Sequence, residues 1–391
     1  MSDQRMDSSA FLLILFLSSL FVCHNGVEGS IELSASEDLE LENQVKLLNK
    51  PAVKTIQTEY GDIYDCVDFY NQPAFDHPML KNHSFYFEMK PTPWFPRKRD
   101  QVRSKVRESL HIRLKDGGCP FGTVPIRRIT KEDLIRERNV SNIRPLDEFA
   151  FGSHFAVVRT KRGAGKYNGA GAALSIHRPR LLRNDQYSAG RIRILNGVDA
   201  IQVGWRVDPG LYGGDTRTRS FIRVDAPQAH CFNTRCPGFV LVRSDIPPDF
   251  VYEQTSKYGG PIYQKQLYIK RDLANGNWWL LIGDDFTPVG FWPKRIFSDL
   301  ANLANYVDWG GHVYTPLGTG FTPEMGTGHF LKTDGRYDAF CRNTQVINEY
   351  DQNVDEFNTE TFHDIGLYEV VDLKNARKYG HVAVYGGPPQ K

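Results

Sequence analysis

The second half of the chain is a succession of short runs of β-branched and aromatic residues. From His154 onward these runs are bounded every few residues by glycine, proline, asparagine or aspartate. Two of them, RIRIL at residues 191–195 and QLYIK at residues 266–270, alternate with a period of two, which is typical of half-buried strands. No regular alternation of strands with helices accompanies them, and this disfavours a parallel sheet. We therefore expect an all-β domain, built as an antiparallel sandwich or barrel.

Helical spacing predicts three helices outside this pattern. Residues 31–50 favour an amphipathic helix whose first turn carries a capping box of Ser34 and Glu37. A short charged helix is expected to begin at Thr130. A third is expected between Pro293 and Gly310, because apolar residues recur there at helical intervals: Phe297, Leu300, Ala304 and Val307.

The chain changes in character between about residues 138 and 152, where a polar stretch separates the mixed first part from the strand-rich second part. At roughly 150 residues per domain, a length of 391 residues allows two or three domains. We expect a small α+β region over residues 30–145 and the all-β domain over residues 150–388.

Residues 1–29 have the features of a secretory signal peptide. A polar start containing Arg5 precedes a largely apolar run of 13 residues, from Phe11 to Cys23, and small residues follow it. A helix needs about 20 apolar residues to cross a bilayer, whereas this length suits the apolar part of a signal peptide. The alternative is a buried core helix. We expect a secreted, extracellular protein whose mature chain has no transmembrane segment.

The balance of charge gives no reason to expect a nucleic acid as partner. Lys and Arg number 48 and Asp and Glu number 46, so the net charge is only +2, which provides no strongly basic surface. The oligomeric state is left open.

An oxidising compartment determines how the cysteines are interpreted, because exported cysteines tend to pair. Cys66 and Cys119 are natural partners within the first region, and Cys231 and Cys236 enclose a short turn. Cys341 is then left over, either as a buried free thiol or as an intermolecular one. Two glycosylation sequons, at Asn82 and Asn139, agree with export.

Common catalytic and cofactor motifs are absent from the sequence. The chain has no G-x-S-x-G, no H-E-x-x-H and no Walker loop, and its glycine-rich run at residues 163–173 lies between predicted strands. No cysteine or histidine pairs have the spacing of a zinc site. We therefore expect neither a cofactor nor a metal ion.

Several ordered motifs resemble a known family. LLNKPAVKTI, DCVDFYNQPAFDHPMLKNH and CPFGTVPIRR resemble the activation-peptide region of the plant neprosin family. HFAVVRT, GWRVDPGLYGGDTRT, NWWLLIGDDFTPVGFWPKRIF, MGTGHF and YGHVAVYGG resemble the neprosin catalytic domain, in the order of that family. The resemblance covers nearly the whole chain after the signal peptide.

This resemblance implies a fold and an activity. Neprosins are secreted glutamic endopeptidases that cleave after proline in acid, and an N-terminal pro-region is removed on activation. Their fold is a sandwich of two curved antiparallel sheets. Residues 30–145 would correspond to the activation peptide and residues 150–388 to the catalytic domain, and a plant protein of this kind would reside in the cell wall or apoplast.

At the two catalytic positions this sequence departs from the family pattern. Where the family carries I-E-A-G-W, this chain reads IQVGW, with Gln202 in place of the glutamate. Where the family carries W-G-G-E, this chain reads WGGH, with His312 in place of the second glutamate. The flanking residues still match and are expected to line the cleft: Trp205, Trp309, Gly310 and Gly311.

These substitutions decide what chemistry is expected. An amide can donate to an oxyanion but cannot act as an acid or base. With an ordinary pKa of about 6.5, a histidine would be mostly protonated at the acid pH of the family. Two other carboxylates, Asp199 and Glu324, lie nearby in sequence, but an odd separation from Gln202 places Asp199 on the opposite face of its strand.

Three functions are compatible with this chemistry. The first is an inactive homologue that binds a peptide, a glycan or a protein partner in the former active cleft. The second is an active prolyl endopeptidase with an altered dyad of Gln202 and His312. The third is a structural wall protein, which no repeat or low-complexity segment supports. Whether the chain is an enzyme is left open, and we favour the first.

Overall fold

The computed structural model describes residues 34–94, 107–108, 112–143, 151–235, 237–318, 320, 322–355, 358–364, 366–376 and 379–388. The predicted signal peptide, residues 1–29, lies outside the described residues, and so do residues 144–150 of the expected linker. Contacts divide the chain into two compact units, residues 1–43 and 44–391. The expected boundary between residues 145 and 150 therefore stays a prediction.

The first two predicted helices are confirmed. Helix α2 runs from Ala35 to Leu48. Its capping box forms as expected, because Ser34 N donates to Glu37 Oε2 at 2.9 Å and Glu37 N donates to Ser34 Oγ at 3.3 Å. The second, α3, spans Lys131–Ile143 and begins with the same reciprocal arrangement between Thr130 and Asp133.

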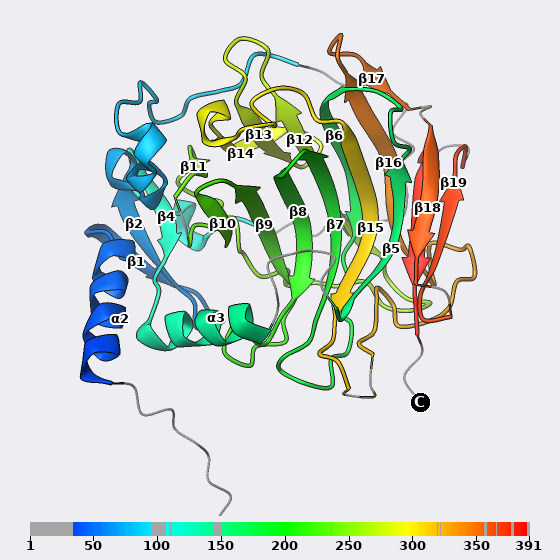
Figure 1. Ribbon diagram of the computed structural model, residues 1–391, viewed down its shortest axis with the longest axis horizontal. Helices are drawn as coiled ribbons and strands as arrows, with labels where there is room; N and C mark the ends of the chain where they lie inside the picture. The colour runs from blue at the N-terminus through cyan, green and yellow to red at the C-terminus, as the bar shows by residue number, and fades with distance from the viewer. Residues whose placement is uncertain are drawn as a thin grey trace, which may run out of the picture. The chain divides into compact units, whose positions relative to one another are not determined.

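A small antiparallel sheet of three strands precedes the sandwich (Figure 1). Its strands, in spatial order, are β1 (Ala52–Gln57), β2 (Ile63–Asp68) and β4 (Thr123–Arg127). The predicted disulfide between Cys66 and Cys119 is confirmed and ties β2 to the segment before β4. Short 3-10 turns occupy the chain between these strands, at Phe69–Asn71, Pro73–Asp76, Pro78–Leu80 and Lys115–Gly117.

One layer of the sandwich is a sheet of seven antiparallel strands, side by side in the centre of Figure 1. In spatial order they are β10 (Ala229–Phe232), β9 (Arg219–Ala226), β8 (Asp199–Val207), β7 (Tyr187–Asn196), β15 (Tyr306–Tyr314), β5 (Ser153–Thr160) and β18 (Thr359–His363).

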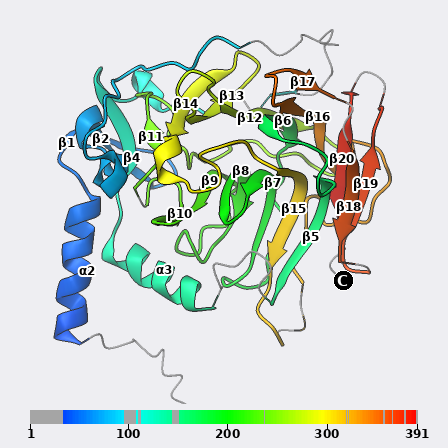
Figure 2. The same cartoon turned by 45° about the horizontal axis from the view of Figure 1, so that its top comes forward.

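The second layer is a larger sheet, whose strands are labelled along the top and the right of Figure 2. Its main path is β11 (Val240–Leu241), β14 (Thr287–Trp292), β13 (Trp278–Ile282), β12 (Tyr263–Arg271), β6 (Tyr167–Ser175), β16 (Ala339–Asn348), β20 (Val382–Gly386) and β19 (Glu369–Leu373). Strand β17 (Asn353–Val354) pairs with β16, and β3 (Arg107–Glu108) pairs with β12 in the parallel sense.

The core lies between these two sheets and is rich in tryptophan. Five indole side chains are fully buried: Trp205, Trp278, Trp292 and Trp309 between the sheets, and Trp279 on the outer face of the second sheet beside Phe291. Trp205 on β8 donates from Nε1 to the carbonyl of Ser175 on β6 at 2.8 Å and so links the two layers. The predicted antiparallel β-sandwich is therefore confirmed.

The predicted third helix, between Pro293 and Gly310, is wrong. A single 3-10 turn, Lys294–Ile296, is followed by an irregular segment, and β15 begins at Tyr306. The apolar residues that suggested a helix are indeed buried, but side chains from elsewhere satisfy the backbone of the segment. Asp199 Oδ2 accepts from the N–H of Leu300 at 3.0 Å, and Trp278 Nε1 donates to the carbonyl of Leu300 at 2.7 Å.

Candidate functional site

Gln202 and His312 lie on the same face of the seven-stranded sheet. Along β8, Ile201, Val203 and Trp205 point into the core, so Gln202 points to the other side because side chains alternate along a strand. His312 on β15 pairs with Ala189, which pairs in turn with Arg206 of β8. Paired residues share a face, so the side chains at both family positions point away from the second sheet.

The two side chains are not directly opposite each other. Strand β7 separates them, and Gln202 pairs with Arg193 whereas His312 pairs with Ala189. Four residues along a strand correspond to about 13 Å. Arg191 lies midway between these two rows of the ladder.

The amide of Gln202 is bound by a buried guanidinium. Arg191 Nη1 donates to Gln202 Oε1 at 2.9 Å, and the two side chains belong to residues that are 1% and 3% exposed. Asp308 of β15 lies beside them, with Oδ1 at 3.3 Å from Arg191 Nη2 and Oδ2 at 3.8 Å from Arg193 Nη1. A carboxylate is thus present on this face, but it is held between two arginines.

His312 is packed among aromatic rings and hydroxyl groups. Its Nε2 lies 3.0 Å from the hydroxyl of Tyr187 and 3.4 Å from Ser153 Oγ. The ring of Phe155 stacks on the imidazole with a centroid distance of 4.5 Å.

Burial lowers the pKa of His312 well below its ordinary value, and the charges of Arg191, Arg206, Arg223 and Arg193 lower it further. This corrects the expectation of an imidazolium in acid, which assumed the solution pKa. Because a buried group among cations avoids a further positive charge, His312 stays neutral to a lower pH than an exposed histidine does.

We call the surroundings of these two residues the arginine face, defined by Arg191, Arg193, Arg206 and Arg223. Arg206 pairs with Asp208 at 2.6 Å and Arg223 with Asp225 at 2.9 Å. The guanidinium of Arg206 also lies 3.5 Å from the ring centroid of Tyr187, a cation–π contact.

Sequence reasoning missed this cluster although a signal was present. In RIRIL the period of two places Arg191 and Arg193 on one face and the isoleucines on the other. The alternation that predicts a strand thus also predicts that one face of it is basic. Asp308 had a weaker signal, as the polar residue two positions before Gly310 in VDWGGH.

The four flanking residues support the sheet. Trp205 and Trp309 lie in the core between the layers, on the opposite face from Gln202 and His312. Gly310 has φ +146°, and a Cβ there would lie 2.2 Å from the carbonyl oxygen of Ala156. A Cβ on Gly311 would lie 2.2 Å from Met325 Sδ. The glycines therefore allow close packing around β15, and the tryptophans do not line the arginine face.

The two other carboxylates near these motifs in sequence, Asp199 and Glu324, bind backbone N–H groups of other segments. Asp199 is fully buried and accepts hydrogen bonds from the N–H groups of Asp299 and Leu300. Glu324 Oε2 accepts from the backbone N–H of Arg180 at 2.7 Å. Both have structural roles here.

The remaining predicted site residues fall into two groups. Cys231 is disulfide-bonded, but Cys236 lies outside the described residues, so this pairing stays a prediction. Cys341 is a buried free thiol. Asn82 is exposed in a turn, whereas the Asn139 side chain lies outside the described residues.

The described part of the chain contains neither a cluster of metal ligands nor a helix suited to a bilayer. No group of three or more His, Cys, Asp or Glu side chains there could hold a metal ion. None of its helices combines the length and the apolar composition needed to cross a bilayer.

Two family models match the chain. The model of the neprosin activation peptide matches residues 55–155, and the neprosin model matches residues 184–388, more than half of the chain. Among solved structures, a Scytalido-glutamic peptidase crystallised with a peptide-based transition-state analogue is 8% identical with a TM-score of 0.34, covering 61% of this chain and 98% of its own. That similarity is too weak to carry a functional argument. On the family models, the chain belongs to the neprosin family.

Proposed function

We propose that this protein is a secreted, catalytically inactive neprosin homologue that binds a peptide or protein segment on the arginine face. One observation carries the proposal. The positions that hold catalytic glutamates in the family hold Gln202 and His312 here, and both side chains are committed to contacts within the arginine face.

The chemistry of a glutamic peptidase needs one group that takes a proton from water and another that donates a proton to the scissile carbonyl. Gln202 can do neither, and its oxygen already accepts from Arg191. His312 is a weak base because its pKa is lowered. Asp308 is a carboxylate, but it is engaged in ion pairs with Arg191 and Arg193.

The chemistry of the face favours a ligand that carries carboxylates. Guanidinium groups bind carboxylates through paired hydrogen bonds, and the rings of Tyr187 and Phe155 offer apolar surface beside them. Because Arg191, Arg193 and Arg206 are at most 6% exposed, binding requires this face to open. An acidic peptide segment is the ligand that we favour over a neutral glycan.

Export is part of the proposal and has separate support. The apolar run at residues 11–23 favours a signal peptide. The disulfide between Cys66 and Cys119 and the exposed sequon at Asn82 both suit an oxidising compartment. N-terminal sequencing of protein recovered from the medium of expressing cells should give a start near residue 30.

Two measurements test the lack of activity and the binding. Purified protein is incubated with a proline-containing peptide between about pH 2 and about pH 8, the range in which carboxylates and histidines titrate, and products are identified by mass spectrometry. We expect no cleavage. Binding is followed by fluorescence anisotropy with an acidic peptide and with a lysine-for-glutamate version of it. Cleavage after proline, or equal binding of the two peptides, would contradict the proposal.

A second candidate is an active prolyl endopeptidase with an altered dyad. It is favoured by the neutral imidazole of His312, which has the Tyr187 and Ser153 hydroxyls within reach of Nε2. The hydrogen bond that Gln202 Oε1 accepts from Arg191 speaks against cooperation with Gln202, because it leaves that amide oxygen engaged within the protein. In the cleavage assay, His312→Gln distinguishes the two candidates, because any activity due to this dyad would be abolished by that change.

A further inference from the structure

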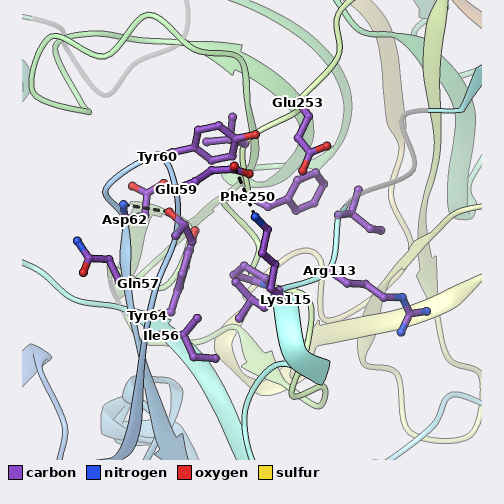
Figure 3. Close-up of a pocket in the computed structure, with 15 residues that line it drawn as sticks. Ile56, Gln57, Glu59, Tyr60, Asp62, Tyr64, Arg113, Lys115, Phe250 and Glu253 are labelled. Atoms are coloured by element: carbon purple, nitrogen blue, oxygen red, sulfur yellow. Dashed lines mark hydrogen bonds and ion pairs between the residues drawn. The ribbon is translucent and has the colours of Figure 1, made fainter.

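A pocket lies beside the hairpin of β1 and β2, far in sequence from the arginine face. Its lining comes from residues 56–64, 112–115 and 247–253 (Figure 3). The walls are apolar side chains that are buried or half-buried: Ile56, Ile112, Leu114, Pro247, Phe250 and Val251. Four charged side chains among the lining residues are exposed instead, those of Glu59, Arg113, Lys115 and Glu253. The pocket thus combines an apolar wall with a charged rim.

Most charges around the pocket already have strong partners. Asp62 is buried and lies 2.7 Å from Arg219 and 3.2 Å from Arg127. Arg113 pairs with Asp245. These groups are therefore committed to the protein and contribute little to a ligand site.

The rim differs because its other charged side chains have weak ion pairs or none within the described residues. Lys115 Nζ lies 3.5 Å from Glu59 Oε2, with side chains 74% and 49% exposed, and exposed pairs of this kind contribute little stability. Within the described residues, Glu253 forms no ion pair. Two carboxylates thus face one exchangeable ammonium group, so the rim has an excess of negative charge.

Tyr60 connects the two carboxylates. Burial and the negative charges of Glu253 and Glu59 raise the pKa of Tyr60 to about 12, so both carboxylates act on its hydroxyl. The ring is held from one side by Arg217, whose guanidinium lies 4.9 Å from the ring centroid and donates to the Tyr60 carbonyl at 2.8 Å. Figure 3 shows Tyr60 and Glu59 on the same side of the pocket as Glu253.

We propose that this pocket binds a cation carried on an aliphatic stem, the chemistry of an arginine or lysine side chain in a peptide. Such side chains place their methylene groups on apolar surface and keep the charged head at the rim. The stem lies on Leu114 and Phe250. The head lies between Glu59 and Glu253 beside the Tyr60 hydroxyl, where it displaces Lys115.

The test uses the full chain after its signal peptide and three probes, with binding followed by calorimetry. The probes are the peptide acetyl-Gly-Arg-Gly-amide, its citrulline analogue of equal shape without charge, and free agmatine. We expect the arginine peptide to bind about tenfold more tightly than the citrulline peptide, the size of one charge-assisted contact. Agmatine binding as tightly as the peptide would identify a small amine as the occupant and overturn the assignment to a peptide side chain.

Two variants with opposite expected effects make the test independent of folding. Glu253→Gln removes one carboxylate and should weaken the arginine peptide several-fold, whereas Lys115→Ala removes the competing ammonium and should strengthen it by roughly twofold to threefold, as expected for an exposed ion pair. Glu349→Gln, at an exposed position outside the lining residues, serves as the matched control and should change nothing. Equal binding of the citrulline peptide, or no change in either variant, overturns the proposal.

Discussion

The junction between the three-stranded sheet and the sandwich buries carboxylates between arginines, whereas the arginine face buries an imidazole among arginines. At the junction, Asp62 and Asp249 lie against Arg127 and Arg219, and Tyr64 donates to Asp249 Oδ1 at 3.1 Å. On the arginine face, Gln202 and His312 occupy the comparable central positions. At the junction carboxylates occupy the central positions, whereas on the arginine face the central positions are neutral and the carboxylates of Asp308, Asp208 and Asp225 pair with the arginines around them.

The same physical cause acts in opposite directions in the two clusters. Burial favours the neutral form of any titratable group. It raises the pKa of Asp249, aided by the nearby charge of Asp62 and opposed by Arg127 and Arg219, and it lowers the pKa of His312. Acid therefore neutralises a carboxylate at the junction, whereas on the arginine face it has no proton to add until the pH is far below 6.5. The two clusters contribute opposite slopes to stability against pH.

The largest expected effect is the loss of a cation at the junction. Arg219→Gln removes the 2.7 Å ion pairs of Arg219 with Asp62 and Asp215, which then retain Arg127 and Arg217 respectively. Breaking a buried ion pair from one side costs roughly 3–5 kcal/mol, so the free energy of unfolding from urea denaturation should fall by that amount. The matched control is Arg336→Gln, because Arg336 makes an ion pair of similar length with Asp334 at the surface. A loss for Arg219→Gln no greater than that of the control would contradict a buried junction.

The next effect is a change in the acid side of the stability profile at His312. The unfolded chain binds a proton at this residue below about pH 6.5, and the folded chain does not, so stability falls with acid by up to about 1.4 kcal/mol per pH unit. His312→Gln removes this term and should flatten the profile between about pH 6.5 and about pH 4.5. His230→Gln, at an exposed histidine, is the control. Parallel profiles of His312→Gln and the natural protein would mean that the imidazole titrates normally.

A third effect tests the opposite slope at the junction. The pKa of Asp249 is about 3.9 in the unfolded chain and is raised in the folded protein. Between these two values the folded state binds the proton more tightly than the unfolded state. The contribution of Asp249 to the free energy of unfolding therefore declines as the pH rises through this window. Asp249→Asn cannot ionise and should gain stability relative to the natural protein as pH rises, by about 1.4 kcal/mol per unit of raised pKa. Asp116→Asn, at an exposed site, should show no such trend. If Asp249→Asn instead becomes less stable than the natural protein as the pH rises, the arginines lower the pKa of Asp249 by more than burial raises it.

Local patterns predicted much of the fold. Alternation with a period of two gave the strands, and the capping box of Ser34 and Glu37 gave the start of α2. The helix expected after Pro293 failed because a buried irregular segment also places apolar residues at intervals of three and four. The irregular segment differs from a helix because the side chain of Asp199 binds its backbone at Leu300. Asp199 is distant in sequence, so residues 293–310 alone do not reveal this contact.

The candidate site was only partly predictable for a related reason. The resemblance gave Gln202 and His312, and the alternation in RIRIL carried Arg191 and Arg193. The lowered pKa of His312 depends on charges from three other strands, which no local window contains. Likewise, the hydrogen bond from Tyr64 to Asp249 joins residues 185 positions apart.

The smallest effect is expected when the arginine face is given the charge composition of the junction. Gln202→Glu adds a carboxylate at 2.9 Å from Arg191, beside Asp308, so that two carboxylates face Arg191 and Arg193 as two face Arg127 and Arg219. A hydrogen bond to a charged group exceeds a neutral one by about 1 kcal/mol, so stability at pH 7 should rise by no more than that. The guanidinium should hold the pKa of the new glutamate down, and the gain should disappear only in strong acid. For the same reason Gln202→Glu alone should give no peptidase activity, whereas Gln202→Glu with His312→Glu and Arg191→Gln restores two carboxylates without the adjacent cation and should cleave after proline in acid. Destabilisation by Gln202→Glu at pH 7 would show that repulsion from Asp308 outweighs the arginines, and that this face already holds as much negative charge as it can accommodate.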